Sequence, residues 1–296
     1  AGLWCPYGQA IDFPTDQSAD DGLSLTFNSA PIEETMDILG FPEVTLTLAA
    51  DQPNALIVVR LCDVSPTGES LLISRGFLNL THRDSFEHPE PLEPGEFYRV
   101  NVRLDVAGHR LPAGHRWRLS VSPTYWPMAW PSPEVVTLRL QLGAGSQLRL
   151  PLRPSKASDA VLPEFGPPEE SQPIPHVRIE PGRRERHIAH DVANKKHTIH
   201  DVADNGRMAL LDNGLEMYGV SEEFYTIYED QPLSANLVCE QHLGLRRGEW
   251  EVRAETYSEM SADEQNFHVI NVISAFEGDV RVFSKTWHKT IPRHLV

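Results

Sequence analysis

Residues 44–81 read VTLTLAADQPNALIVVRLCDVSPTGESLLISRGFLNLT. Three apolar or alternating segments are separated here by Asp-Gln-Pro-Asn and Ser-Pro-Thr-Gly, which are sequences typical of turns. Alternation with a period of two predicts β-strands, and such short turns predict antiparallel neighbours. The stretch therefore indicates an antiparallel β-sheet.

The same alternation extends through the first half of the chain. The strand patterns lie at residues 24–27, 44–49, 55–64, 71–81, 97–106, 115–122, 135–142 and 147–152. About eight strands in about 130 residues predict an all-β, two-sheet antiparallel sandwich, best described as a jelly roll of the galactose-binding-like type. Residues 31–40, PIEETMDILG, differ: Pro31 near the start, the acidic residues and Gly40 at the end predict one short helix.

A second β region follows a proline-rich segment. Residues 154–181 contain seven prolines and predict a linker or surface strap. Strand patterns return at residues 223–229, 235–243, 249–257, 266–277 and 280–287, with hairpin turns at 246–248 and 277–279. We therefore divide the chain into a jelly-roll sandwich (1–153), the linker (154–181) and a second antiparallel β domain or extension (182–296). Strands added to the first sandwich are the alternative.

Composition excludes several classes of partner. The net charge is −16 and no Lys/Arg run exceeds two residues, which argues against nucleic-acid binding. No apolar run approaches the length of a membrane span, and no secretion signal is visible. The three cysteines lie far apart, and their odd number favours a reducing, cytoplasmic location. Among them, Cys62 is expected to be a small buried hydrophobic residue.

Residues 187–196 (HIAHDVANKK) and 197–206 (HTIHDVADNG) form a repeat with a period of ten. The turn-like Asn-Lys-Lys predicts that the two copies form a hairpin. The repeat carries His187, His190, His197 and His200. Residues three apart on a strand point to opposite faces, so His187 and His190 cannot bind one ion without a bulge. One histidine from each copy can still meet across the hairpin. A solvated polar hairpin is favoured, so no metal or cofactor is expected, and a zinc site is the alternative.

An aspartate cluster near the start of the chain offers a second metal alternative. Asp16, Asp20 and Asp21 are residues that calcium loops of β-sandwiches use. Aspartate-rich turns more often cap and solvate the backbone, which is the favoured interpretation.

An aromatic loop follows a tight turn at residues 112–115. Tyr125, Trp126 and Trp130 lie within six residues and are held between prolines. Such a stiff apolar surface predicts a contact with another domain, and His115 from the turn is expected to join it. The alternatives are a sugar-stacking platform and a plug at the end of the sandwich.

The sequence contains no motif that matches nucleophilic catalysis. Ser24 and Ser70 have only the first glycine of a Gly-x-Ser-x-Gly elbow, and no His-x-His pair occurs. We interpret His82, His109 and His115 as hydrogen-bonding residues. The chain alone is therefore expected to be inactive.

Four segments resemble a known family in order and spacing: residues 16–48, 58–83, 91–133 and 148–154. They resemble the C-terminal non-catalytic β-sandwich of X-Pro dipeptidyl-peptidase and cocaine esterase hydrolases, the CocE/NonD group of peptidase family S15. The resemblance implies an α/β-hydrolase domain in the same polypeptide, which precedes the sandwich and carries a Ser-Asp-His triad.

The resemblance also implies an activity and a role. The parent protein would hydrolyse acyl bonds as a dipeptidyl-peptidase, esterase or amidase. This part would pack on the catalytic domain and shape its cleft or a homo-oligomer. A stand-alone carbohydrate- or ligand-binding module is the alternative.

Overall fold

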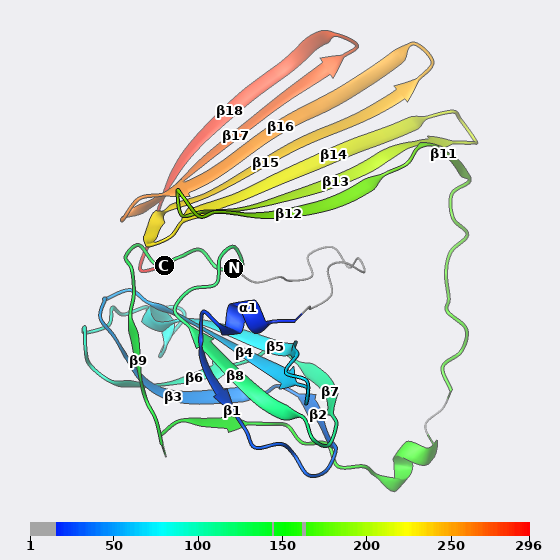
Figure 1. Cartoon of the computed structure of the whole chain (residues 1–296). Helices are drawn as coiled ribbons and strands as arrows, with labels where there is room; N and C mark the ends of the chain where they lie inside the picture. Colours follow the sequence, from blue (N-terminus) through cyan, green and yellow to red (C-terminus); the bar gives the residue numbers. More distant parts are fainter. Residues whose placement is uncertain (1–15, 144, 162–163) are drawn as a thin grey trace. The chain divides into compact units, whose positions relative to one another are not determined.

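The structure is a computed structural model that describes residues 16–143, 145–161 and 164–296. The chain divides into two compact units (Figure 1). The first holds residues up to Glu164 together with Leu295 and Val296, and the second holds Phe165–His294. Strands dominate both units and all pair antiparallel, so the all-β prediction is confirmed. No helix among the described residues is long and apolar enough to cross a membrane.

The first unit contains two four-stranded sheets and a two-stranded ribbon. One sheet has the order β1-β8-β4-β5; the other has the order β10-β3-β6, with β9 also pairing with β3; the ribbon is β2-β7. Each of the eight predicted strand segments contains a strand, whereas the jelly-roll assignment stays a prediction. The elements are α1 (Ser18–Asp21), β1 (Leu25–Asn28), β2 (Met36–Gly40), β3 (Glu43–Ala50), β4 (Leu56–Val64), β5 (Ser70–Asn79), β6 (Tyr98–Arg103), β7 (Ala107–Leu111), β8 (Arg116–Ser122), β9 (Leu138–Gln141) and β10 (Gln147–Arg149).

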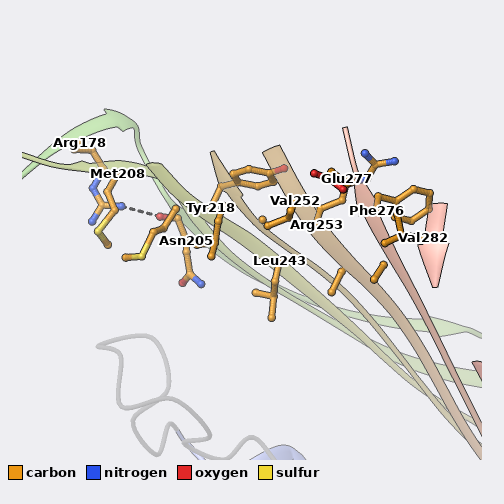
Figure 2. A pocket seen from close by; sticks show the side chains of 15 residues that line it. Arg178, Asn205, Met208, Tyr218, Leu243, Val252, Arg253, Phe276, Glu277 and Val282 are labelled. Atoms are coloured by element: carbon orange, nitrogen blue, oxygen red, sulfur yellow. Dashed lines mark hydrogen bonds between the residues drawn. The ribbon is translucent and has the colours of Figure 1, made fainter. Parts of the chain in front are cut away.

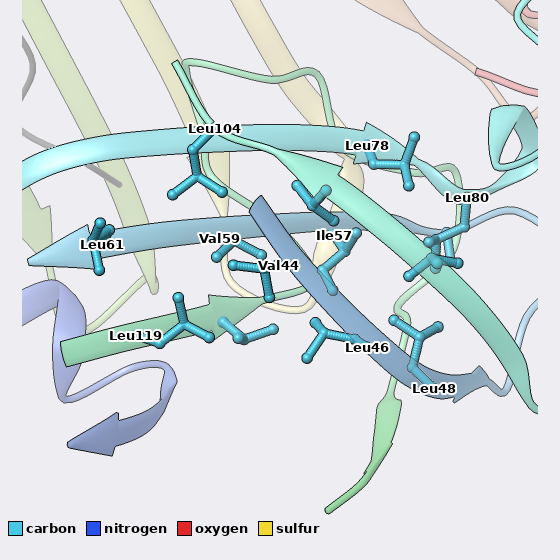
Figure 3. Close-up of a cluster of buried hydrophobic side chains, with 14 of the residues drawn as sticks. Val44, Leu46, Leu48, Ile57, Val59, Leu61, Leu78, Leu80, Leu104 and Leu119 are labelled. Atoms are coloured by element: carbon cyan, nitrogen blue, oxygen red, sulfur yellow. The ribbon is translucent and has the colours of Figure 1, made fainter. Parts of the chain in front are cut away.

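The core of the first unit is built by alternate residues of its strands (Figure 3). Strand β4 is the exception to alternation, because all nine of its residues are buried. Ile57, Val59 and Leu61 join the main apolar cluster. Leu56 and Val58 belong to a second cluster instead. A strand covered on both faces reads as a continuous apolar run, which explains LIVVRLCDV.

The helix predicted at residues 31–40 is wrong. Met36–Gly40 forms β2, which pairs with β7 in the register Met36↔Leu111 to Gly40↔Ala107. Ile38 is 2% exposed and lies in the main cluster. The acidic residues and terminal glycine favour a helix only weakly, and cross-strand pairing with burial of Ile38 outweighs that preference.

The second unit is an eight-stranded antiparallel sheet of order β11-β13-β14-β15-β16-β17-β18, in which β12 also pairs with β13. The predicted hairpins at 246–248 and 277–279 are confirmed, with Gly248 and Gly278 at positive φ. Strand β11 begins inside the segment predicted as a linker. The strands are β11 (His176–Glu180), β12 (Arg183–Asp191), β13 (Lys196–Leu210), β14 (Glu216–Tyr228), β15 (Gln231–Arg247), β16 (Trp250–Ala262), β17 (Asn266–Glu277) and β18 (Val280–Pro292).

This second sheet has little buried core of its own. Among the described residues of the unit, its buried apolar side chains are Ile199, Val202 and Ala235. Nearly every residue of β14, β16 and β17 is half-buried, whichever face it points to. The sheet is therefore held mainly by its long hydrogen-bonded ladders and cross-strand side-chain pairs.

Candidate functional site

Tyr125 anchors the aromatic loop on the outer face of β4. Its side chain is 4% exposed and packs with Leu56 and Val58. Its ring centroid lies 6.2 Å from that of Phe77, and its hydroxyl donates to Asp20 Oδ2 at 3.3 Å. Burial, with the nearby Asp20 charge, raises the pKa of Tyr125 to about 12. Tyr125 is thus a fixed, neutral part of the first unit.

The two tryptophans of the loop lie edge to face. Their ring centroids are 5.1 Å apart at an interplanar angle of 82°. Trp126 is 5% exposed, whereas residues 127–130 are half-buried. Stacking on a sugar requires an open ring face, which the buried Trp126 does not offer. The contact role of Tyr125, Trp126 and Trp130 stays a prediction, and the accessible part of the loop is residues 127–130.

A buried polar network lies beside Tyr125. The Arg60 side chain is buried, and its guanidinium lies 5.4 Å from the centre of the Tyr125 ring. It donates to Gln17 Oε1 at 3.0 Å and to Ser24 Oγ at 3.1 Å, and it lies 3.1 Å from Asp21 Oδ1. Arg60 therefore ties the segment around α1 to strand β4.

Asp21 is the anionic centre of this network. It accepts hydrogen bonds from Ser120 at 2.6 Å, from Ser70 at 2.7 Å and from Arg118 at 2.9 Å. Burial by itself would raise the pKa of Asp21, but these three hydrogen bonds and the Arg60 charge outweigh it and hold that pKa below its ordinary value.

The three aspartates considered for calcium have different partners. Asp16 accepts from the backbone amides of Ser18 and Ser70. The carboxylate of Asp20 lies 3.8 Å from Arg60, and that of Asp21 is enclosed by donors. The three carboxylates therefore face hydroxyl, amide and guanidinium donors. In this arrangement they anchor the local turn and the buried polar network.

His115 is held by a carboxylate shared with a second histidine. Its Nδ1 lies 2.7 Å from Asp63 Oδ1, and the Nε2 of His109 lies 3.0 Å from Asp63 Oδ2. His82 Nδ1 lies 3.0 Å from Thr81 Oγ1. The prediction that these histidines form hydrogen bonds is confirmed. The contact role of His115 stays a prediction.

The histidine repeat forms the predicted hairpin. Strands β12 and β13 pair in a register that places His190 opposite His197 and His187 opposite His200. The His190 and His197 rings are stacked, with centroids 4.0 Å apart. As the strand parity requires, the four histidines do not converge, because the two pairs lie on opposite faces.

Glu229 joins the His190–His197 pair and was missed by the sequence reasoning. Its Oε1 lies 2.8 Å from His190 Nε2 and 3.2 Å from His197 Nε2. The hydrogen bond from His197, with that from His190, holds the pKa of Glu229 below its ordinary value although burial opposes this. The sequence predicts that Glu229 ends a strand. It does not predict that Glu229 contacts two histidines more than thirty residues earlier in the chain.

The other pair of the repeat is arranged differently. The His187 and His200 ring centroids are 5.9 Å apart. His200 stacks on Phe224 and has Glu222 as its carboxylate partner, whereas His187 has Glu185. Among the described residues, these two histidines have different carboxylate partners.

Figure 2 shows the side chains that line a pocket on the second sheet, which sequence reasoning also missed. Its volume is about 730 Å³. Apolar side chains from several neighbouring strands line it, including Met208, Leu243, Val252 and Phe276. No periodic motif marks such a pocket, because its lining comes from strands that are brought together only by folding.

The two cysteines of the described residues are poor nucleophiles. Burial raises the pKa of Cys62 to about 12, and its side chain is buried as predicted. Burial also raises the pKa of Cys239. A catalytic thiolate requires the opposite shift.

Comparison with known proteins identifies the family. The family model for the X-Pro dipeptidyl-peptidase C-terminal non-catalytic domain matches residues 7–198. A putative serine esterase of Mycobacterium bovis is 28% identical in an alignment of 132 residues that covers 39% of this chain and 21% of that protein. A Xaa-Pro dipeptidyl-peptidase of Lacticaseibacillus casei is 26% identical in an alignment of 180 residues that covers 49% of this chain and 22% of that protein.

Solved structures give a weaker likeness. An α-amino acid ester hydrolase matches with a TM-score of 0.46 at 26% identity, over 48% of this chain and 28% of that one. The matched part of this chain spans about a fifth of the length of the curated relatives described above. The resemblance predicted from sequence is confirmed by the family match, which covers more than half of the chain. The chain therefore belongs to the family of X-Pro dipeptidyl-peptidase C-terminal non-catalytic domains.

Proposed function

We propose that the chain serves an S15-like serine hydrolase by packing on an α/β-hydrolase domain of the same polypeptide, and that the complete protein hydrolyses ester or Xaa-Pro amide bonds. The observation that carries this proposal is the family match over residues 7–198, since that family is described as non-catalytic. The names of the relatives, a serine esterase and a Xaa-Pro dipeptidyl-peptidase, support the acyl-bond chemistry.

The contact with the catalytic domain is assigned to residues 127–130 and to the turn that ends at His115. Tyr125 is fixed beside Arg60, and His115 is held by Asp63, so both segments are ordered before any partner binds. Ordered contact segments lose little conformational entropy on docking. Residues 127–130 retain accessible apolar surface, which docking would remove from water.

The first test concerns catalysis by the chain itself. Purified chain is assayed with p-nitrophenyl esters and Xaa-Pro p-nitroanilides, and no turnover above buffer is expected. The reading frame upstream of Ala1 is expected to encode a Gly-x-Ser-x-Gly elbow, which would supply the nucleophile.

The second test concerns the contact. The α/β-hydrolase domain from that reading frame is expressed separately, and its affinity for the chain is measured by calorimetry. Trp130→Ala is expected to weaken binding at least tenfold, whereas Phe86→Ala, at an exposed aromatic on another loop of the first unit, leaves it unchanged. Equal affinities would contradict the assigned contact. Binding on a glycan array that is lost in Trp126→Ala and Trp130→Ala would support the carbohydrate-binding alternative instead.

A further inference from the structure

His190, His197 and Glu229 bring three metal-ligating atoms together in the second unit. His190 lies near the end of β12 and His197 near the start of β13, directly opposite one another. Glu229 follows β14, and its backbone amide donates to the Lys195 carbonyl at 2.9 Å, which holds it beside the hairpin turn. The three ligand atoms lie within 4.8 Å of one another, and this is the one such group found among the described residues.

We propose that these three residues form a binding site for one divalent transition-metal ion of the Zn²⁺ type. The site is independent of the function proposed above. The donor set consists of two imidazole nitrogens and one carboxylate oxygen. Such sets suit Zn²⁺, Ni²⁺ and Cu²⁺, and they leave a fourth position for water.

The spacing of the ligand atoms fits this coordination. Zn–N and Zn–O bonds of about 2.0–2.2 Å in a tetrahedron separate neighbouring ligand atoms by about 3.4 Å. Glu229 Oε1 already lies 2.8 Å from His190 Nε2 and 3.2 Å from His197 Nε2. Opening these two distances by a few tenths of an ångström would match them to that spacing. The stacked His190 and His197 rings would also have to tilt, because an imidazole binds a metal along the nitrogen lone pair in its ring plane and parallel rings direct these lone pairs side by side.

Accessibility and charge also favour a cation here. The side chains of His190, His197 and Glu229 are 43%, 36% and 37% exposed, so an ion can enter and keep a water ligand. One carboxylate serves both imidazoles and provides a formal negative charge. The bound ion would link β12 to the end of β14 across β13.

The second histidine pair of the repeat provides a matched internal control. His187 and His200 belong to the same hairpin and are also direct cross-strand partners. Their carboxylate partners, Glu185 and Glu222, are different residues, and the rings are farther apart. Histidine content alone therefore predicts binding at both pairs, whereas the converging donor set predicts it at His190 and His197 only.

The test uses the full chain without an affinity tag, treated with EDTA and then dialysed. Zn²⁺ is titrated by calorimetry, and the absorption of bound Co²⁺ gives an independent measure of the coordination. We expect one Zn²⁺ per chain, together with visible Co²⁺ bands of a four-coordinate site. His190→Ala, His197→Ala and Glu229→Gln are each expected to weaken Zn²⁺ binding at least tenfold and to remove the Co²⁺ bands. His187→Ala leaves both unchanged.

Far-UV circular dichroism of each variant shows whether the sheet is intact, and Glu229→Gln preserves the shape of the side chain where the alanine variants do not. Absence of stoichiometric Zn²⁺ binding by the unaltered chain would overturn the proposal. An equal loss in His187→Ala would overturn it as well, because binding would then follow histidine content rather than this geometry.

Discussion

Arg60 and Asp21 form an ion pair inside the first unit, and both side chains are buried. Because of this burial, the pair is important for the unfolding free energy. Replacing Arg60 by Met keeps much of the side-chain volume but leaves Asp21 buried with one charged partner fewer. Removing one member of a buried pair costs about 3–5 kcal/mol of unfolding free energy. We expect a loss in that range for Arg60→Met, measured by urea unfolding with tryptophan fluorescence.

The control for this variant is Asp37→Asn, which breaks the solvent-exposed pair with Arg110. Exposed pairs are screened by water, so little change in stability is expected there. Equal effects of Arg60→Met and Asp37→Asn would contradict the role given to the buried network.

Asp21 also predicts how stability depends on pH. Its folded-state pKa is depressed, so its carboxylate contributes stability above the pKa of the unfolded chain, about 3.9. That contribution is lost as the pH falls through the lower, folded-state pKa. The unfolding free energy of the unaltered chain is therefore expected to fall more steeply below about pH 4 than that of Asp21→Asn. Urea unfolding between pH 6 and pH 2.5 measures both curves, and parallel curves would refute the assignment.

At the scale of single strands, Gly244 shows why the second sheet tolerates a large ring beside a small residue. Tyr218 lies directly opposite Gly244 across β14 and β15, and a Cβ added at Gly244 would lie 2.0 Å from Tyr218 Cζ. The ring would have to leave, which would break its 2.7 Å hydrogen bond to Glu251. Gly244→Ala is expected to cost about 1–3 kcal/mol, measured by thermal unfolding.

Gly166→Ala is the matched control, because an added Cβ there meets nothing within 4 Å. An unchanged melting temperature for Gly244→Ala, alongside an unchanged one for Gly166→Ala, would show that the Tyr218 ring does not depend on this glycine.

The elements also show what a sequence pattern can predict. Period-two alternation located most strands of both units, because burial of alternate residues follows directly from strand geometry, but it did not predict β2, β7 or β11. The same parity separated His187 from His190 onto opposite faces. The helix prediction for residues 31–40 was wrong because the local preference for a helix is weak. The strand that decides their structure, β7, lies about seventy residues later in the chain.

The candidate sites follow the same division between local and long-range information. His190 and His197 could be paired from a hairpin, which is local. Glu229 reaches them only through the register of β13 with β14. The residues that line the pocket of Figure 2 come from seven strands, β11 and β13–β18, so that pocket also depends on long-range register. Local patterns do not contain that register.

For the whole molecule, the division into two units predicts where proteases cut. Residues 164–175 are exposed and lack regular structure. We expect the endoproteinase Glu-C to cleave first at Glu164, Glu169 or Glu170, since backbone without ladder hydrogen bonds fits most readily into a protease. Mass spectrometry identifies the cut, and circular dichroism is expected to show intact β-structure afterwards. A first cut within β13–β18 would contradict the proposed division.

In the function that we propose, the chain contributes structure and contacts to a hydrolase without performing hydrolysis itself. Incubation of the purified chain with a fluorophosphonate, followed by intact-mass spectrometry, tests this most directly. We predict a single unmodified species at the 33.3 kDa mass of the chain. A stoichiometric phosphonyl adduct on one serine, prevented by an ester or Xaa-Pro substrate, would contradict the claim.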